Sequence, residues 1–259
     1  MKILVLGAAG FIGKNLVKKL IEKKQNDLVL YDERVCDYTE VSSSFSRDRI
    51  EVICGNFLEE DFGKLTKDID IVYHLISTTL PNTSMKLLAK GINDNVVVTS
   101  RLLDACVDNG VKKLIFLSSG GTVYGVGNKV PYSEDSLTNP ISAYGLQKLS
   151  IEKMLYLYNY LYGLDYRIIR LSNPYGPYQN PNGVQGAVTT FVYNALYNKP
   201  IHVYGDGSVI RDYIYIDDAI GSIQKIASYE GEYRIFNVGS GKGKSINDVI
   251  AAIETVLNK

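Results

Sequence analysis

Tyr144 and Lys148 lie four residues apart, and these two side chains could carry out proton chemistry together. If their segment is helical, positions i and i+4 lie on one face, about one turn apart. A nearby ammonium group favours the phenolate form of tyrosine and so lowers its pKa, which is ordinarily about 10. Such a phenolate could accept the proton of a hydroxyl group while a hydride leaves the same carbon. An ordinary solvent-exposed helix would have the same spacing, so the pair alone leaves both interpretations open.

A glycine-rich turn, Gly7 to Gly13, follows the first predicted strand. Its glycines permit a tight turn and let the backbone approach a pyrophosphate, and the helix predicted to begin at Phe11 would direct free N–H groups at the phosphates. Asp32 ends the second predicted strand, where a carboxylate would bind the adenosine ribose and repel a 2′-phosphate. The pattern predicts a dinucleotide site and favours NAD over NADP, although Arg34 is close enough to keep NADP open.

Predicted strands and helices alternate along the first two thirds of the chain. The strand segments are apolar without alternation, which is typical of a parallel sheet covered by helices on both faces. The pattern predicts an α/β fold, a Rossmann-type doubly wound parallel sheet. The strands are predicted at Lys2–Leu6, Leu28–Tyr31, Ile50–Ile53, Ile69–Leu75, Lys112–Leu117 and Tyr166–Leu171, and the helices at Phe11–Lys24, Met85–Asn109 and Ser142–Tyr162.

A stretch rich in Pro, Asn, Gly and Tyr, residues 173–182, marks the predicted exit from the nucleotide-binding domain. We therefore expect an NAD-binding domain over residues 1–172 and a smaller substrate-binding region over residues 173–259. Part of the second region, near residues 211–230, is expected to pack back on the first domain.

Composition limits the classes of function. The 259 residues carry 28 basic and 28 acidic side chains, so the zero formal charge suggests neither a nucleic-acid nor a membrane partner. No apolar run approaches the roughly 18 residues of a membrane span, and no secretion signal precedes Gly7. Cys36, Cys54 and Cys106 lack metal-ligand spacing and are expected to be buried thiols of a cytoplasmic protein. With only two histidines, we expect no metal site.

Ordered motifs along the whole chain resemble the extended short-chain dehydrogenase/reductase family, in its branch of NAD-dependent nucleotide-sugar epimerases and dehydratases. Within that branch the chain is most similar to the UDP-sugar 4-epimerases, UDP-glucose being the expected type of substrate. The resemblance implies bound NAD, a catalytic Tyr144 and Lys148, and a nucleoside-diphosphate sugar in the cleft between the domains. The motifs are the glycine turn, Asp32, Ser118–Gly125, Tyr144–Lys148, Arg170–Gly176, Gly205–Gly207 and Arg211–Asp218.

The resemblance also implies which side chains line the site. Asn56 and Phe57 would lie beside the adenine, Ser118 near the nicotinamide, and Arg211 would hold a phosphate through its planar guanidinium. A buried Asn that satisfies backbone groups and an ordinary surface Arg remain the alternatives, and His74 is expected to be a core residue. The implied cofactor-binding residues are Gly7, Gly10, Phe11, Ile12, Gly13, Asp32, Asn56, Phe57, Leu75, Asn95, Ser118, Tyr144 and Lys148. The implied substrate-binding residues are Ser119, Thr122, Asn173 and Arg211.

The chain departs from the family pattern at Gly120, where many epimerases carry Ser and many dehydratases carry Thr. Thr122 lies two residues later, and in an extended segment it would point to the same face. We therefore assign Thr122 the hydrogen bond to the sugar 4-oxygen, with an ordinary strand-forming role as the alternative. Gly121 and Thr122 also stand where the dehydratases carry Asp-Glu, so the resemblance favours neither dehydration nor decarboxylation.

The resemblance implies reversible epimerisation at C4 of the sugar through a transient 4-keto intermediate. Tyr144 would take the proton of the 4-hydroxyl as C4 loses a hydride, and Lys148 would lower the pKa of Tyr144. Because no net oxidation follows, NAD is expected to stay bound through turnover. Two alternatives remain, a nucleotide-sugar 4-keto reductase that exchanges its cofactor and a non-catalytic NAD-binding sensor.

Two predicted helical stretches, residues 95–107 and 151–161, are apolar on more than one face. One face would cover the sheet, so the other is expected to form a two-fold homodimer as a four-helix bundle, which the resemblance also implies. We expect Leu155 in this interface; the alternative is a monomer whose second face is covered by the substrate-binding region. The chain stops in a predicted helix, Ser245–Leu257, whereas family members usually continue, so we expect either a truncated chain or a naturally short protein.

Overall fold

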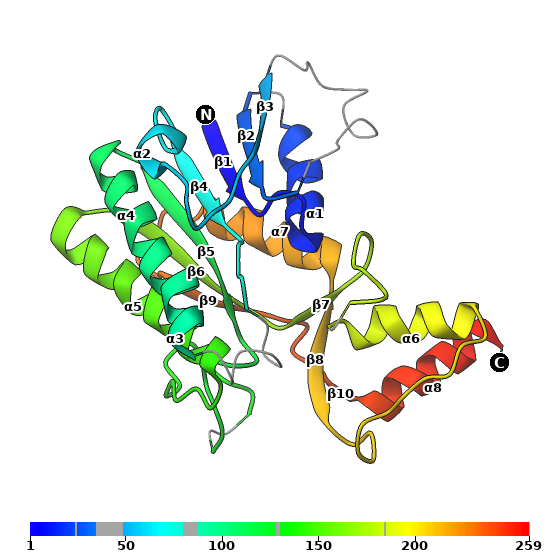
Figure 1. Ribbon diagram of the computed structural model, residues 1–259. Coiled ribbons are helices and arrows are strands. Elements are labelled where there is room, and N and C mark those ends of the chain that lie inside the picture. Colours follow the sequence, from blue (N-terminus) through cyan, green and yellow to red (C-terminus); the bar gives the residue numbers. More distant parts are fainter. Residues whose placement is uncertain (24, 35–48, 80–87, 128–129, 184, 259) are drawn as a thin grey trace.

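A seven-stranded parallel sheet dominates the computed structural model, which describes residues 1–23, 25–34, 49–79, 88–127, 130–183 and 185–258 (Figure 1). The strand order is β3-β2-β1-β4-β5-β6-β9, so the chain runs outward from the centre in both directions. This order defines a doubly wound sheet, and the predicted fold class is confirmed. The strands are β1 (Lys2–Leu6), β2 (Asp27–Asp32), β3 (Ile50–Cys54), β4 (Ile71–His74), β5 (Lys113–Ser119), β6 (Asp165–Leu171) and β9 (Ile235–Val238).

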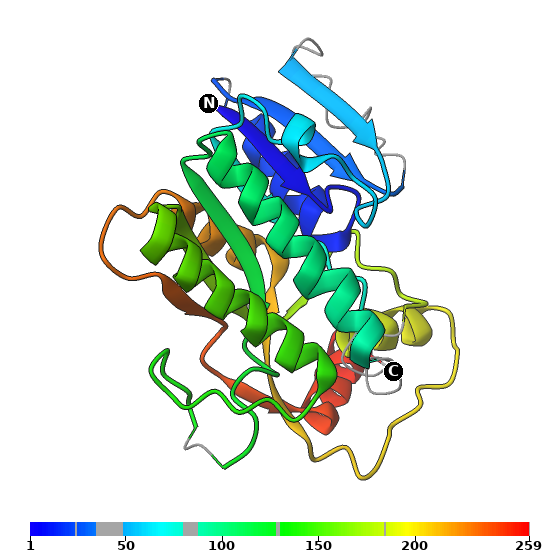
Figure 2. The same cartoon turned by 60° about the vertical axis from the view of Figure 1, so that its left-hand side comes forward.

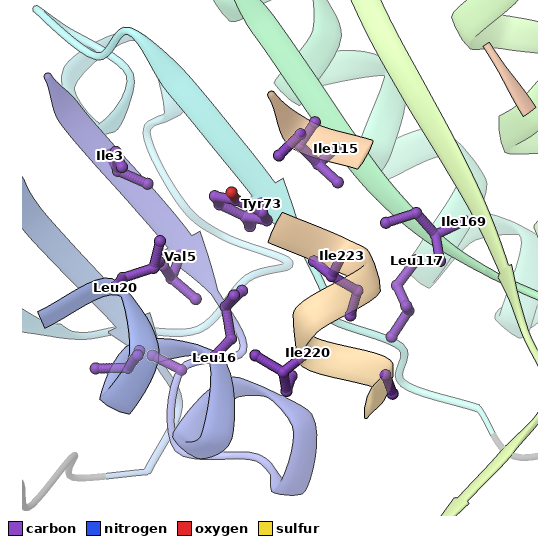
Figure 3. Close-up of a cluster of buried hydrophobic side chains, with 14 of the residues drawn as sticks. Ile3, Val5, Leu16, Leu20, Tyr73, Ile115, Leu117, Ile169, Ile220 and Ile223 are labelled. Atoms are coloured by element: carbon purple, nitrogen blue, oxygen red, sulfur yellow. The ribbon is translucent and has the colours of Figure 1, made fainter. Parts of the chain in front are cut away.

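Helices cover both faces of this sheet. On one face α1 (Phe11–Ile21) packs against α7 (Ile216–Ala227), and on the other α4 (Val98–Asp108) lies beside α5 (Ala143–Tyr162) (Figures 1 and 2). In the first core, Leu16 of α1 and Ile220 of α7 meet Val5 of β1 (Figure 3). Because the central strands are covered on both faces, burial of their apolar side chains provides the main stabilisation.

One predicted helix is built in three parts. It runs through α3 (Leu88–Gly91), a π-helical segment η4 (Ile92–Val97) and α4, while the predicted residues 85–87 lie outside the described part. A π-helical segment changes the direction in which side chains point and is frequent at functional sites. Here it carries Asn95, whose Oδ1 accepts a hydrogen bond from the Thr78 N–H, beyond the end of β4. The short helix α2 (Phe62–Leu65) packs against α4.

A second, smaller sheet lies beside the first. Its order is β10-β8-β7, formed by β7 (Asn173–Tyr175), β8 (Ile210–Tyr215) and β10 (Gly243–Ser245), and α6 (Ala187–Leu196) packs against α8 (Ile246–Leu257) next to it (Figure 1). After β8 the chain returns to the large sheet as α7 and β9, where Ile220 and Val238 join its core. The division into two domains at residue 172 stays a prediction.

Two burial predictions were wrong. β3 was expected to be buried on both faces, but it is the edge strand of the sheet, and Val52 is 48% exposed. Cys54 at the end of β3 is also exposed, whereas Cys106 is buried and Cys36 lies outside the described residues. A run of apolar residues predicts a strand, but its place in the sheet decides how much of it is covered.

Candidate active site at the carboxyl edge of the sheet

The turn after β1 has the shape of an anion-binding cradle. Gly7 has a φ of +88°, a left-handed value that glycine adopts without strain, and a Cβ on Gly13 would lie 2.1 Å from the Gly7 carbonyl oxygen. Gly10 is the N-cap of α1, and no side-chain hydrogen bond caps this helix start. The first-turn N–H groups of Phe11, Ile12 and Gly13 therefore suit a negatively charged ligand. The cradle fits the pyrophosphate of a dinucleotide.

Asp32 lies beside this cradle at the end of β2. Its Oδ2 accepts a hydrogen bond from the Ala9 N–H at 3.0 Å, and its Oδ1 accepts hydrogen bonds from Arg34, from N–H at 3.1 Å and from Nε at 3.4 Å. The Arg34 side chain is 69% exposed and its Nη2 would lie 3.9 Å from a Cβ on Gly10. The Asp32 carboxylate is therefore placed to accept a hydrogen bond from a ribose hydroxyl, and the Arg34 guanidinium lies beside it.

Tyr144 and Lys148 lie on the same side of α5, as their spacing predicted. Ser142 caps the helix by accepting a hydrogen bond from the Gly145 N–H at 3.1 Å. Lys148 Nζ donates to the carbonyl of Leu117, near the end of β5, at 2.9 Å and lies 5.6 Å from the centroid of the Tyr144 ring. A small pocket opens between the end of β4 and α5. It is lined by Ile76, Ser77, Asn95, Thr99, Tyr144, Gln147, Lys148 and Ile151.

Burial opposes the charged form of both members of this pair. It raises the pKa of the Tyr144 phenol to about 12. It lowers the pKa of Lys148 to about 8, and the negative charge of Glu152 acts on Lys148 in the opposite direction. The expected lowering of the Tyr144 pKa by Lys148 is therefore not found in the protein alone, because desolvation is the larger effect.

Thr122 approaches Tyr144 from the loop after β5. Residues 120–122 form a turn and are not extended, so the expectation based on strand alternation was wrong. Thr122 reaches the site in another way, because its carbonyl oxygen would lie 2.6 Å from a Cβ on Gly145, the residue after Tyr144. The Thr122 hydroxyl is buried and has no hydrogen-bond partner among the described residues.

The backbone of β6 passes close behind Gly120. A Cβ at this position would lie 3.0 Å from the Arg170 carbonyl oxygen and 3.4 Å from that of Leu171, both on β6. The Gly120 N–H also donates to the Leu171 carbonyl at 2.8 Å. Glycine therefore stands at position 120, in place of the Ser or Thr of the family pattern, where this turn comes close to β6.

Several predicted cofactor residues use their side chains within the fold. Asn95 Nδ2 donates to Thr78 Oγ1 at 2.8 Å and to the Gly91 carbonyl at 3.0 Å. Ser118 Oγ donates to Glu152, on the face of the sheet covered by α5. Phe57 is 6% exposed, and its ring packs against Phe62 and His74. Their contacts with a cofactor stay predictions.

The other predicted residues lie at the edges of the site. Asn56 is exposed and accepts a hydrogen bond from the Leu58 N–H, and Leu75 packs against the core beside the Gly7 turn. Asn173 on β7 donates through Nδ2 to the Asp212 carbonyl on β8 at 2.9 Å. Arg211 is exposed, and its Nη1 donates only to the neighbouring Ile210 carbonyl at 3.0 Å among the contacts described.

His74 is a core residue, as expected. It is 1% exposed, its Nε2 lies 3.0 Å from Thr99 Oγ1, and its ring packs near Phe116. Burial lowers the pKa of His74 to about 3, so the imidazole is neutral at ordinary pH. Within the described residues, no group of His, Cys, Asp and Glu side chains could hold a metal ion. None of the described helices has both the length and the apolar character that a membrane span requires.

A buried polar network that the sequence pattern did not predict lies behind Tyr144 and Lys148. Arg170 Nη2 donates to Glu152 Oε2 at 2.7 Å, and Arg170 Nη1 donates to the Tyr124 hydroxyl at 3.0 Å. Gln147 Oε1 accepts a hydrogen bond from Asn95 at 3.1 Å. The sequence held one signal, because Glu152 lies four residues after Lys148, on the same side of a helix.

Three comparisons describe what the chain is similar to. The model of the NAD dependent epimerase/dehydratase family matches residues 3–239. UDP-glucose 4-epimerase of Mycolicibacterium smegmatis is 34% identical over 98% of this chain and 82% of its own length. The dTDP-4-dehydro-6-deoxyglucose reductase of Escherichia coli is also 34% identical, over 99% of this chain and 82% of its own. The crystal structure of UDP-glucuronic acid 4-epimerase from Bacillus cereus, with UDP-glucuronic acid and NAD, matches with a TM-score of 0.86 at 33% identity, over 100% of this chain and 84% of that one.

Replacing Gly13 by alanine is expected to weaken NAD binding by more than about tenfold, or about 1.4 kcal/mol, because the new Cβ would displace the turn. Gly221→Ala on α7 is the matched control, since nothing lies within 4 Å of its Cβ. Calorimetric titration with NAD, together with the melting temperature of each variant, makes the measurement. Equal affinity of the Gly13→Ala and unmodified proteins would refute the cradle.

Proposed function

The chain belongs to the NAD dependent epimerase/dehydratase family, and we propose that within it the protein inverts C4 of a UDP-linked hexose. The observation that carries this proposal is the placement of Tyr144 and Lys148 on one side of α5, where the backbone of Thr122 packs against Gly145. This set can move one proton to and from a sugar hydroxyl. The relatives named UDP-glucose and UDP-glucuronic acid 4-epimerases support a UDP sugar as the substrate class.

The cofactor is NAD, and the residues of the first turn fit it. The cradle of Gly7, Gly10 and Gly13 would hold the pyrophosphate, and Asp32 the adenosine ribose. When bound, NAD supplies the hydride acceptor and donor and, in its oxidised form, a positive charge at the nicotinamide.

Tyr144 is assigned the role of base and acid. As a phenolate it accepts the proton of the sugar 4-hydroxyl while the C4–H bond breaks, which leaves a 4-keto sugar. The same phenol returns the proton after the sugar has turned over and C4 has regained a hydride on its opposite face. Lys148, held by the Leu117 carbonyl, favours the phenolate by its charge, and Thr122 donates a hydrogen bond to the 4-oxygen.

Arg211 and Asn173 are assigned to the diphosphate end of the substrate. Arg211 is exposed on β8, and its guanidinium is suited to two parallel hydrogen bonds with phosphate oxygens. Asn173 lies on the adjacent strand, β7, where it pairs with Tyr213, two residues after Arg211. These roles place the nucleotide over the small sheet and the sugar toward Tyr144.

The first test is the reaction itself. The protein is incubated, without added cofactor, with UDP-glucose, UDP-galactose and their N-acetyl and uronate forms, and the products are separated by chromatography. We expect one C4 pair to interconvert. Tyr144→Phe is expected to lower turnover by ~10²–10⁴-fold while bound NAD stays constant, because only the proton acceptor is lost.

Two results would contradict this assignment. Turnover by Tyr144→Phe equal to that of the unmodified protein would remove Tyr144 from the mechanism. Consumption of NADPH with a 4-keto nucleotide sugar, and no interconversion, would favour the reductase, whose relative is as similar as the epimerase. NAD binding without either reaction would favour the non-catalytic sensor.

Thr122→Val is expected to lower turnover about tenfold without changing NAD binding, because it keeps the shape and removes one hydrogen bond to the sugar. Ser119→Ala is the matched variant, since Ser119 is the last residue of β5 and the loop that carries Thr122 begins directly after it. Steady-state kinetics with the active sugar separate the two. If Ser119→Ala loses turnover and Thr122→Val does not, Ser119 holds the 4-oxygen.

We further propose that two copies associate through α4 and α5, which lie side by side on the outside of the subunit (Figure 2). The exposed apolar residues of α5 include Tyr156, Leu157, Tyr160 and Leu161, and Val97 is exposed directly before α4. Leu155, expected in the interface, is instead fully buried within the subunit, so a charge there would test folding and not association. Exposed apolar patches of this kind mark interfaces.

Leu157→Glu combined with Leu161→Glu is expected to convert a dimer into a monomer, because both side chains are exposed at 47% and 54% and their change need not disturb the core. Val256→Glu on α8, where the side chain is 77% exposed, is the control. Light scattering at micromolar concentration measures the mass. If the unmodified protein is a monomer, or if the doubly substituted protein is still a dimer, the face formed by α4 and α5 is not a dimer interface.

A further inference from the structure

Glu152 is a buried carboxylate that has no part in the reaction proposed above. It is 3% exposed and lies one helical turn after Lys148 on α5. Its oxygens accept hydrogen bonds from Ser118 Oγ and from Arg170, through Nε at 3.2 Å and Nη2 at 2.7 Å. A buried ion pair is often no more stabilising than apolar residues of similar volume, because desolvation of the charges opposes it. Stability alone therefore does not explain this pair.

Arg170 extends the interaction to the loop between β5 and α5. Its Nη1 donates to the Tyr124 hydroxyl and to the Glu134 carbonyl, both at 3.0 Å. Tyr124 is 1% exposed, and its hydroxyl donates to Asn237 Oδ1 on β9 at 2.5 Å. The guanidinium thus holds the loop at two points, both of which lie in the segment between Thr122 and Tyr144.

The sheet register explains how one carboxylate reaches all these groups. Ser118 on β5 pairs with Arg170 on β6, and Arg170 pairs with Asn237 on β9. The three polar side chains form a row across adjacent strands, and Glu152 meets this row from α5. Any shift of α5 along the sheet would separate Glu152 from the row. The pair therefore fixes the helix of Tyr144 relative to the loop of Thr122.

Glu152 also acts on the charge of Lys148. Burial disfavours the ammonium and lowers its pKa, and Glu152 is the charge that offsets this effect. The ionisable groups that interact with Lys148 are Tyr144 and Glu152 on α5 and His74 on β4, and Arg170 on β6 is paired with Glu152. His74 is neutral, so among the described residues the charge of Glu152 and the hydrogen bond to the Leu117 carbonyl support the ammonium.

We propose that Glu152 is a positioning residue for the reaction: paired with Arg170, its carboxylate fixes α5, which carries Tyr144 and Lys148, against β6 and the loop between Thr122 and Tyr144. The catalytic consequence rests on the proposed function, whereas the effect on Lys148 concerns the protein alone. Glu152 itself touches neither sugar nor cofactor in this assignment. It acts through Lys148, through Ser118 and, by way of Arg170, through Tyr124.

The informative variant neutralises the pair. Glu152→Gln alone leaves the Arg170 charge buried without a partner, which can prevent folding. Glu152→Gln combined with Arg170→Gln removes both charges together. The control is Asp70→Asn combined with Lys112→Gln, a 2.7 Å ion pair next to the amino ends of β4 and β5, at the opposite edge of the sheet.

The pH profile of kcat separates positioning from a structural role. In the productive form Tyr144 is a phenolate and Lys148 is an ammonium, whereas in the unproductive form both groups are neutral. The two forms carry the same number of protons, so their ratio depends on the difference between the two pKa values and not on pH. Of the two charges that the double variant removes, Glu152 is the one that acts on the pKa of Lys148, so loss of the pair lowers this pKa and favours the unproductive form. We expect the high-pH plateau of kcat to fall about tenfold for each unit by which the pKa of Lys148 falls. The acidic limb of the profile should move to lower pH. If kcat instead falls by the same factor at every pH and the acidic limb does not move, the proposal is overturned.

A second readout needs no substrate. The ¹³C NMR signal of the Lys148 ε-carbon, identified by its absence from Lys148→Arg, is expected to titrate near pH 8 in the unmodified protein. It should titrate at lower pH in the neutralised pair and be unchanged in the control. An unchanged titration in the neutralised pair would overturn the proposal. An unmodified protein that acts on no nucleotide sugar would instead refute the proposed function, so the two failures are distinguishable.

Discussion

The buried ion pair between Glu152 and Arg170 is the interaction on which the geometry of the candidate site depends. Two charges are tolerated in a core only where hydrogen-bond partners surround them, and here Ser118, Tyr124 and the Glu134 carbonyl complete the set. These partners come from β5, from the loop after it and from β6, while Glu152 comes from α5. Satisfying one pair of charges therefore fixes the relative position of every element that carries a proposed catalytic group.

The remainder of the site follows from the parallel sheet. Carboxyl ends of parallel strands meet at one edge, so the Gly7 turn, Asp32, Leu75 and Ser119 come together there although they are far apart in the chain. Close backbone contacts bring the loops within reach. A Cβ on Gly125 would lie 1.8 Å from the Asn139 carbonyl oxygen, and one on Gly145 would lie 2.6 Å from that of Thr122. These glycines are needed because backbone occupies the space of a side chain.

The electrostatics of the site suit a protein that acts only when its cofactor is in place. Burial opposes both the phenolate of Tyr144 and the ammonium of Lys148. Glu152 supports one of them, and the cradle admits a cofactor that carries positive charge in its oxidised form. The same pair would serve an epimerase or a reductase, which explains how relatives with either name have equal similarity to this chain.

Patterns that depend on neighbouring residues could be read from the sequence. The strand, glycine turn and helix at residues 2–21 and the shared side of Tyr144 and Lys148 are of this kind, because local spacing determines them. The turn at residues 120–122 was missed, since its shape depends on the approach of β6 to Gly120. The partnership of Glu152 with Arg170 was missed too, because it joins a helix to a strand.

Burial was the other property that the sequence left open. Leu155 and Leu157 are both apolar residues of α5, yet one is fully buried and the other is 47% exposed. Likewise β3 has the apolar composition of an interior strand but lies at the edge of the sheet. Sequence determined which segments form helices and strands and which side chains could do chemistry. Only the tertiary structure decided which groups meet and which are covered, because burial and charge pairing depend on atoms brought together from distant parts of the chain.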